Sequence, residues 1–136
     1  MVAIDANPIA IDTQLALVID DDARVAQFIE TTLVQLDMKA AIFPMAKEAL
    51  ASLDNVHPGI IFLDVALLRS DAIDVLHGLG ARHYRGTVQL MSGGRPSLLD
   101  AVQRIGAREG MTLAPPLNKP FASEAIVQVI RSLRGQ

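Results

Sequence analysis

Short apolar runs alternate along the chain with segments in which apolar residues recur every three or four positions. The apolar runs predict strands at residues 15–19, 38–43, 59–63, 86–91 and, most weakly, 111–114. The first, third and fourth runs are the most apolar of the five, as strands are when helices cover both faces of a sheet. The alternation therefore predicts a doubly wound α/β fold with a five-stranded parallel sheet and five helices.

The periodic segments predict the helices between and after these strands. The first is the clearest, and its apolar stripe consists of Val25, Phe28, Ile29, Leu33 and Leu36. Shorter helices are expected at about residues 46–53, 72–82 and 97–109, and Gly110 would end the last of these. The final helix should open at Ser123, whose hydroxyl is suited to cap a helix N-terminus.

The length of 136 residues corresponds to a single domain. We expect a flexible N-terminal tail at residues 1–14 and the domain itself at residues 15–136. The apolar runs are much shorter than the roughly 18 residues that a membrane span needs, so no membrane contact is expected. The first residues also lack the basic-then-apolar pattern of a secretory signal, and the expected location is therefore cytoplasmic.

Charge and cysteine content narrow the classes of partner. Twelve Lys and Arg residues stand against fifteen Asp and Glu residues, which makes −3 at neutral pH, and the basic residues are scattered. Proteins that bind a phosphate backbone usually carry a clustered basic excess, so no direct nucleic acid partner is expected. The chain has no cysteine, which excludes disulfides, thiolate catalysis and Cys-ligated zinc.

Polar residues follow four of the predicted strands. The first strand ends in Asp20–Asp21–Asp22 and the third in Asp64, while the fourth leads to Ser92–Gly93–Gly94 and the fifth to Asn118–Lys119–Pro120. Because functional residues of doubly wound sheets gather at the carboxyl ends of the strands, these groups should converge at one edge. Carboxylates, a hydroxyl and a lysine suit a divalent cation with a phosphoryl group, since Mg²⁺ takes oxygen ligands from carboxylates, phosphate and water.

Each of these features also has a purely structural interpretation. Three acids after a strand often begin a helix, because carboxylates cap free N–H groups and favour the positive end of the helix dipole. Asp22 is expected to act mainly in that way. The segments around Ser92 and Lys119 have compositions that are common in turns, so their place in one ordered series is what favours function.

At these residues the sequence resembles the receiver domains of two-component response regulators, over about residues 15–133. The motifs that carry the resemblance are Val18-Ile19-Asp20-Asp21-Asp22, Phe62-Leu63-Asp64, Leu90-Met91-Ser92-Gly93 and Lys119-Pro120-Phe121. Each lies at a predicted strand end, in the order and at the spacing of the family. The resemblance implies the flavodoxin-like receiver fold, with strand order 2-1-3-4-5, and a role in bacterial phosphorelay signalling.

The resemblance also implies how a phosphoryl group would be held. Asp64 would accept it from a histidine kinase or a phosphotransfer protein and form an acyl phosphate. Ser92 would place its hydroxyl on a phosphoryl oxygen, while Gly93–Gly94, without Cβ atoms, would let the backbone approach. Lys119, aimed inward by a cis bond to Pro120, would pair with another oxygen or, before phosphorylation, with Asp64. The chain would be no enzyme beyond catalysing its own phosphorylation and dephosphorylation.

Mg²⁺ is the cofactor that the resemblance implies. Asp21 would bind the ion directly and Asp20 through water, while Asp64 and the backbone carbonyl of Ala66 would complete the protein ligands. The chemistry requires such an ion, because a carboxylate is a weak nucleophile toward an anionic phosphoryl group unless a cation neutralises the transferring oxygens.

Two segments depart from the family pattern. Receivers typically place proline and then Asp-Gly after the phosphoacceptor, at positions occupied here by Leu68, Asp71 and Ala72. The loop is therefore expected to run differently, because proline no longer restrains it and alanine does not easily adopt positive φ. Pro116 stands where the family commonly has an aromatic residue, which removes the usual aromatic coupling. Together with Pro115 it predicts a short or irregular fifth strand.

The region from Ser97 to Phe121 is similar to receivers found before EAL-type cyclic-di-GMP phosphodiesterase domains. That likeness implies an output domain of this kind as a partner, and a homodimer is a second arrangement through which phosphorylation could act. The departures at Leu68, Ala72 and Pro116 leave a further hypothesis open: a degenerate receiver that serves only as a docking or dimerisation module.

A third hypothesis is a phosphatase of the haloacid-dehalogenase type. Asp20 and Asp22 match its Asp-x-Asp motif, and Ser92 and Lys119 fit its later motifs in order. Arg24 stands where that family has Thr or Val, and no acidic pair follows Lys119, which places this hypothesis last.

Overall fold

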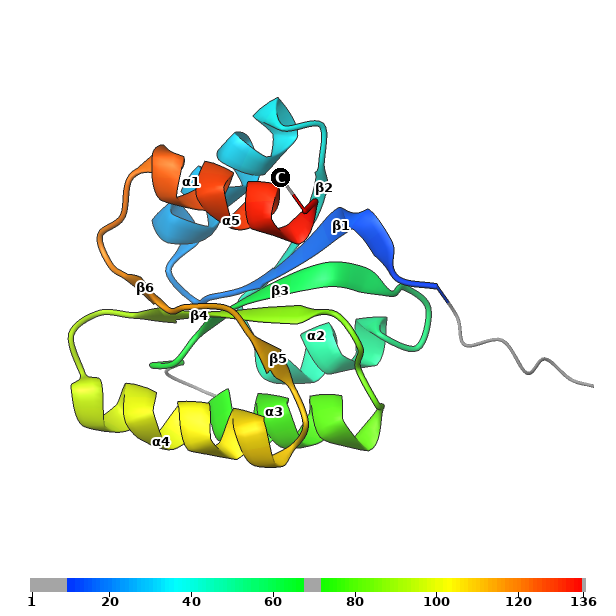
Figure 1. Cartoon of the computed structure of the whole chain (residues 1–136), viewed down its shortest axis with the longest axis vertical. Coiled ribbons are helices and arrows are strands. Elements are labelled where there is room, and N and C mark those ends of the chain that lie inside the picture. The colour runs from blue at the N-terminus through cyan, green and yellow to red at the C-terminus, as the bar shows by residue number, and fades with distance from the viewer. Residues whose placement is uncertain (1–9, 68–71, 136) are drawn as a thin grey trace, which may run out of the picture.

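The computed structural model describes residues 10–67 and 72–135, in which strands and helices alternate along the chain. Figure 1 shows a central sheet with helices on both of its faces. In chain order the elements are β1 (Asp12–Ile19), α1 (Ala23–Gln35), β2 (Lys39–Phe43), α2 (Ala46–Ser52), β3 (Pro58–Asp64), α3 (Ala72–Ala81), β4 (Thr87–Ser92), α4 (Pro96–Arg108), β5 (Thr112–Leu113), β6 (Leu117–Asn118) and α5 (Ser123–Leu133).

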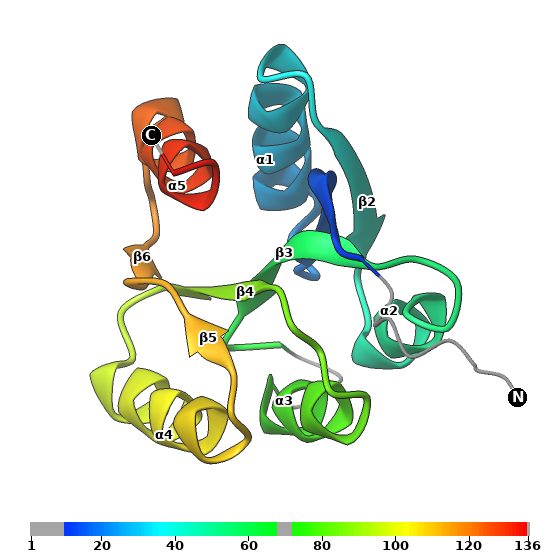
Figure 2. The ribbon, with the colours of Figure 1, turned by 45° about the vertical axis from the view of Figure 1, so that its right-hand side comes forward.

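The strands pair in parallel in the order β2-β1-β3-β4-β5, and β6 also pairs with β4. Helices α1 and α5 cover one face of the sheet, and α2, α3 and α4 cover the other (Figure 2). Successive side chains of a strand point to opposite faces. Leu17 and Ile19 therefore pack with the α2–α4 side, and Ala16 and Val18 with the α1–α5 side. The predicted doubly wound fold with five helices and strand order 2-1-3-4-5 is confirmed.

Strand β1 begins at Asp12, three residues earlier than the predicted start at residue 15. The Asp12 amide donates to the His57 carbonyl at 2.6 Å, and Asp12 lies opposite Pro58 of β3. Residues 12–14, which the sequence placed in a flexible tail, thus belong to the sheet. Their exposed side chains give no apolar signal, because this end of the strand is held by backbone pairing.

The fifth strand position is occupied by two short strands instead of one. β5 pairs with the start of β4 and β6 with its end, and Pro115–Pro116 separates them. Proline has no N–H to donate, so the ladder is interrupted at this point. The irregularity was predicted, but β6 itself was missed because two residues carry no periodic pattern.

The helix boundaries agree with the prediction to within one or two residues. The cap of α5 and the burial of Phe28 differ from it. Ser123 is the first residue of α5 and does not cap it, since Ala122 occupies the cap position without a side-chain hydrogen bond. Phe28, placed by its spacing in the buried stripe of α1, is 39% exposed. Gly110 follows the α4 cap residue Glu109 with φ of +78°, which confirms its role as a stop.

Of the unusual residues after Asp64, Leu68 and Asp71 lie outside the described residues. Ala72 begins α3, and its side chain is buried in the core on the α2–α4 side. Within the described part of the chain, no helix combines the length and apolar character needed to cross a membrane.

Substituting Asp22 tests how α1 begins. The Asp22 Oδ1 atom accepts a hydrogen bond from the Arg24 amide at 3.0 Å, as expected of an N-cap. Asp22→Ala should lower the free energy of unfolding by about 1 kcal/mol, whereas Asp22→Asn should change it little because Asn also caps. Urea denaturation of the two variants provides the measurement, and an equal loss in both would contradict the capping role.

Candidate functional site

Four strands bring their carboxyl ends to one edge of the sheet. Asp20 directly follows β1, and Asp64 ends β3, which lies between β1 and β4. The registers match Ile19 with Leu63 and Asp64 with Met91, so these strands end at the same level. We call the group formed by Asp20, Asp21, Asp64 and Lys119 the acid pocket. The sequence correctly placed all four residues at this edge.

Three carboxylates converge in the acid pocket. Asp20, Asp21 and Asp64 each offer an oxygen, and these oxygens all lie within 4.8 Å of one another. Asp20 is 1% exposed and Asp64 5% exposed, while Asp21 is half-buried. Hard oxygen donors at this spacing fit Mg²⁺, which binds through one or two carboxylates and completes its shell with water or phosphate.

Lys119 supplies a positive charge to the acid pocket. Its Nζ atom lies 2.7 Å from Asp20 Oδ2 and 3.5 Å from Asp64 Oδ1. The expected pairing with Asp64 is therefore present, although Asp20 is the closer partner. The Lys119 amide donates to the Ser92 carbonyl at 2.7 Å, and the bond to Pro120 is cis, as the resemblance implied.

Burial and charge shift the protonation of this pair. Burial raises the pKa of Asp20 above 3.8, with a smaller contribution from the Asp64 charge, and these effects exceed the lowering by Lys119 and the Asp22 amide. For Lys119, burial lowers the pKa, but the hydrogen bond and charge of Asp20, assisted by Asp64, outweigh it and raise the pKa above 10.5. The two shifts therefore have different main causes: burial raises the pKa of Asp20, and the neighbouring carboxylates raise the pKa of Lys119.

Backbone amides orient the two buried carboxylates. The Asp22 amide donates to Asp20 Oδ1 at 2.9 Å, and the Ala66 amide donates to Asp64 Oδ1 at 3.1 Å. Such bonds fix the carboxylate planes, and the bond from the Asp22 amide also lowers the pKa of Asp20. Ala66 is therefore adjacent to the acid pocket, and the use of its carbonyl as a metal ligand stays a prediction.

Ser92 and the glycines after it border the pocket from β4. Ser92 is buried and pairs with Asn118 of β6, one residue before Lys119. Gly94 has φ of +100°, which favours glycine. A Cβ atom on Gly93 would meet no protein atom within 4 Å, so the chain leaves open space beside this residue.

A hollow of about 620 Å³ adjoins the acid pocket. Phe28 of α1 and Phe121 lie on it with ring centroids 6.3 Å apart, and Lys119 lines it as well. This surface was not predicted from the sequence, because periodicity assigned Phe28 to the core. The sequence feature that could have indicated it is an aromatic residue, Phe121, directly after the Lys119–Pro120 motif.

The fold and the acid pocket together define a doubly wound α/β domain with three acids and one lysine at the carboxyl ends of its parallel strands. The chain belongs to the response regulator receiver domain family, because the family model with that description matches residues 16–131. It is thus a receiver domain of the two-component response regulator type, as the sequence indicated. No curated protein matches the sequence significantly.

Solved structures of receiver domains have the same fold. The signal receiver domain of a response regulator from Bermanella marisrubri has a TM-score of 0.75 and 26% identity, over 90% of this chain and 99% of that chain. A CheY-like receiver domain protein from Methanospirillum hungatei JF-1 has a TM-score of 0.76 and 17% identity, over 91% and 96%. The beryllofluoride-activated NtrC4 receiver domain dimer has a TM-score of 0.75 and 19% identity, over 89% and 96%.

The raised pKa of Asp20 predicts a specific pH dependence of stability. Between 3.8 and the higher folded-state value, the folded chain binds more protons than the unfolded chain. The free energy of unfolding should therefore fall as pH rises through this window, by up to about 1.4 kcal/mol per pH unit for one proton. The Asp20→Asn variant should not show this fall in the free energy of unfolding.

The measurement is urea denaturation at closely spaced pH values in buffer with a metal chelator. Asp22→Asn is the matched control, because it removes an exposed carboxylate two residues away and keeps the helix cap. If the wild-type and Asp20→Asn curves stay parallel while pH changes, Asp20 does not carry this effect.

Proposed function

We propose that Asp64 accepts a phosphoryl group from a histidine kinase or a phosphotransfer protein, in a reaction that requires Mg²⁺. One observation carries this proposal: the Asp64 carboxylate is buried at a strand end, beside two further acids and 3.5 Å from the Lys119 ammonium. No other described carboxylate combines a buried position with both an acidic cluster and a cation, apart from Asp20, which Lys119 already holds at 2.7 Å.

In the proposed step, a carboxylate oxygen of Asp64 attacks phosphorus and forms an acyl phosphate. The bond from phosphorus to the donor nitrogen breaks, and the imidazole leaves with the electron pair and takes up a proton. The Ala66 amide keeps the attacking carboxylate in one orientation. Lys119 then pairs with a phosphoryl oxygen, and Ser92 donates its hydroxyl to another. Mg²⁺, held by Asp20, Asp21, Asp64 and the Ala66 carbonyl, would supply the positive charge that the transferring oxygens need.

The new acyl phosphate would act as a switch and not as a step in steady turnover. A phosphoryl group biases a protein between two conformations when it binds them with different affinity. The output would pass to a partner in the cytoplasm, either a domain such as an EAL-type phosphodiesterase or a second copy of the chain. A dimer occurs in the beryllofluoride-activated NtrC4 receiver domain, which supports the second arrangement.

Phosphorylation at Asp64 is directly measurable. Incubation with acetyl phosphate and Mg²⁺ should add the mass of one phosphoryl group to the wild-type chain, and Asp64→Asn should lose this addition completely because an amide is not a suitable nucleophile. Asp100→Asn, which removes an exposed carboxylate on α4, is the control and should react like the wild type. Unchanged labelling of Asp64→Asn, detected by intact-mass spectrometry, would overturn the proposal.

Magnesium binding is testable without any phosphoryl donor. Mg²⁺ at ten times its dissociation constant should raise the free energy of unfolding by about 1.4 kcal/mol, and a chelator should remove the gain. Asp21→Asn should abolish most of it, whereas Asp22→Asn should keep it. A wild-type chain that gains no stability at millimolar Mg²⁺ would favour the docking or dimerisation module instead.

The phosphatase hypothesis is not retained. In that mechanism Asp22 would need a carboxylate facing the reacting group, but Asp22 Oδ1 caps α1 through the Arg24 amide. The family match over residues 16–131, which is to receiver domains, also supports the proposed function over the phosphatase.

A further inference from the structure

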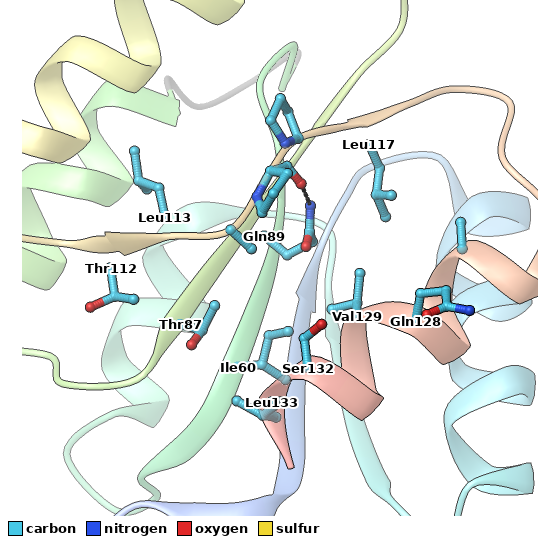
Figure 3. A pocket seen from close by; sticks show the side chains of 14 residues that line it. Ile60, Thr87, Gln89, Thr112, Leu113, Leu117, Gln128, Val129, Ser132 and Leu133 are labelled. Atoms are coloured by element: carbon cyan, nitrogen blue, oxygen red, sulfur yellow. Dashed lines mark hydrogen bonds between the residues drawn. The ribbon is translucent and has the colours of Figure 1, made fainter. Parts of the chain in front are cut away.

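A cavity of about 530 Å³ lies between α5 and the sheet edge formed by β4, β5 and β6 (Figure 3). Ile60 and Gln89 of the sheet line it, as do Val129 and Ser132 of α5. The lining contains no ionisable side chain, and no residue of the acid pocket belongs to it. This cavity is therefore a separate feature with a largely apolar wall.

The cavity lies where Pro115–Pro116 interrupts the fifth strand position. β5 pairs with the start of β4, and β6 pairs with its end. Gln89 and Leu90, in the middle of β4, therefore have no strand partner on the side away from β3. The Gln89 side chain takes over part of the pairing. Its Nε2 atom donates to the Pro115 carbonyl at 2.8 Å and to the Leu90 carbonyl at 3.2 Å.

These two bonds leave the other end of the Gln89 amide without a partner. Both acceptors are carbonyls, so nitrogen must face them, and Oε1 is turned to the opposite side, towards α5 (Figure 3). Gln89 is 0% exposed, and Oε1 is the single buried side-chain polar atom in the described residues that lacks a hydrogen bond. A buried acceptor of this kind is costly, and an N–H or O–H group that enters the cavity would satisfy it.

We propose that this cavity binds a small neutral organic molecule with an apolar body and one N–H or O–H group that donates to Gln89 Oε1. The volume lies in the range of about 300–1,000 Å³ that is usual for small-molecule sites. The absence of charged groups from the lining excludes a strongly charged ligand, because nothing there would compensate its desolvation. Because Oε1 is itself buried in this structure, a ligand reaches it only when the lining side chains around it move slightly apart, and such a ligand must carry a hydrogen-bond donor.

A pair of probes tests the proposal: indole, which has one N–H donor, and benzothiophene, which has nearly the same shape and none. Each is titrated into the ¹⁵N-labelled wild-type chain without Mg²⁺ or a phosphoryl donor, and binding is followed by NMR chemical shifts. We expect shifts in α5, β4 and the Gln89 side-chain amide, and an affinity about tenfold higher for indole. Equal affinities, or shifts elsewhere, would overturn the proposal.

Variants locate the site. Ser132→Leu should fill the cavity and weaken indole binding at least tenfold, whereas Ser123→Leu, the same change on an exposed residue of α5 outside the lining, should leave it unchanged. Gln89→Met should remove the preference for indole over benzothiophene. The Ser pair decides the result if Gln89→Met does not fold. Equal binding to both Ser variants contradicts the proposal, and so do shifts that depend on protein concentration alone, which would mean that a second copy fills the cavity.

Discussion

The parallel pairing of β1, β3 and β4 is the constraint on which the site depends. In a parallel sheet every strand ends at the same edge, so residues far apart in the chain meet without any long loop to carry them. Asp20 and Asp64 are brought together in this way, and β6 adds Lys119 through its pairing with the end of β4. The core clusters on both faces hold this edge rigid, since they bury β3 along its whole length.

The convergence of these strand ends also places an excess of negative charge at this edge of the sheet. Three carboxylates share one lysine, and two of them are almost fully buried. Burial raises the pKa of Asp20, and the nearby carboxylates raise the pKa of Lys119. A pocket with this excess of negative charge would attract a divalent cation, and under the proposed function that cation would permit an anionic phosphoryl group to approach a carboxylate.

The β5–β6 segment connects the two features that the structure adds to the sequence. At Pro115–Pro116 it lines the cavity beside Gln89, and directly after Pro116 it returns to the sheet as β6, which positions Lys119. Leu117 belongs to both regions, because it lines the cavity and pairs with Met91 next to Ser92. Pro116, which stands where the family commonly has an aromatic residue, thus lies in the segment that lines the cavity.

The sequence by itself determined the fold class and the four groups of the acid pocket, because strand ends follow directly from apolar runs and motifs. The strand order followed from the resemblance to receiver domains. It also identified Asp22 as a cap and Gly110 as a stop, which are local effects of one helix terminus. Tertiary structure decided what depends on contacts between distant segments: the pairing of Asp12 with β3, the exposure of Phe28 beside Phe121, the closer pairing of Lys119 with Asp20, and the unpaired oxygen of Gln89. A pattern along the chain records which face a side chain occupies, but it contains no information on the partner that lies across from it.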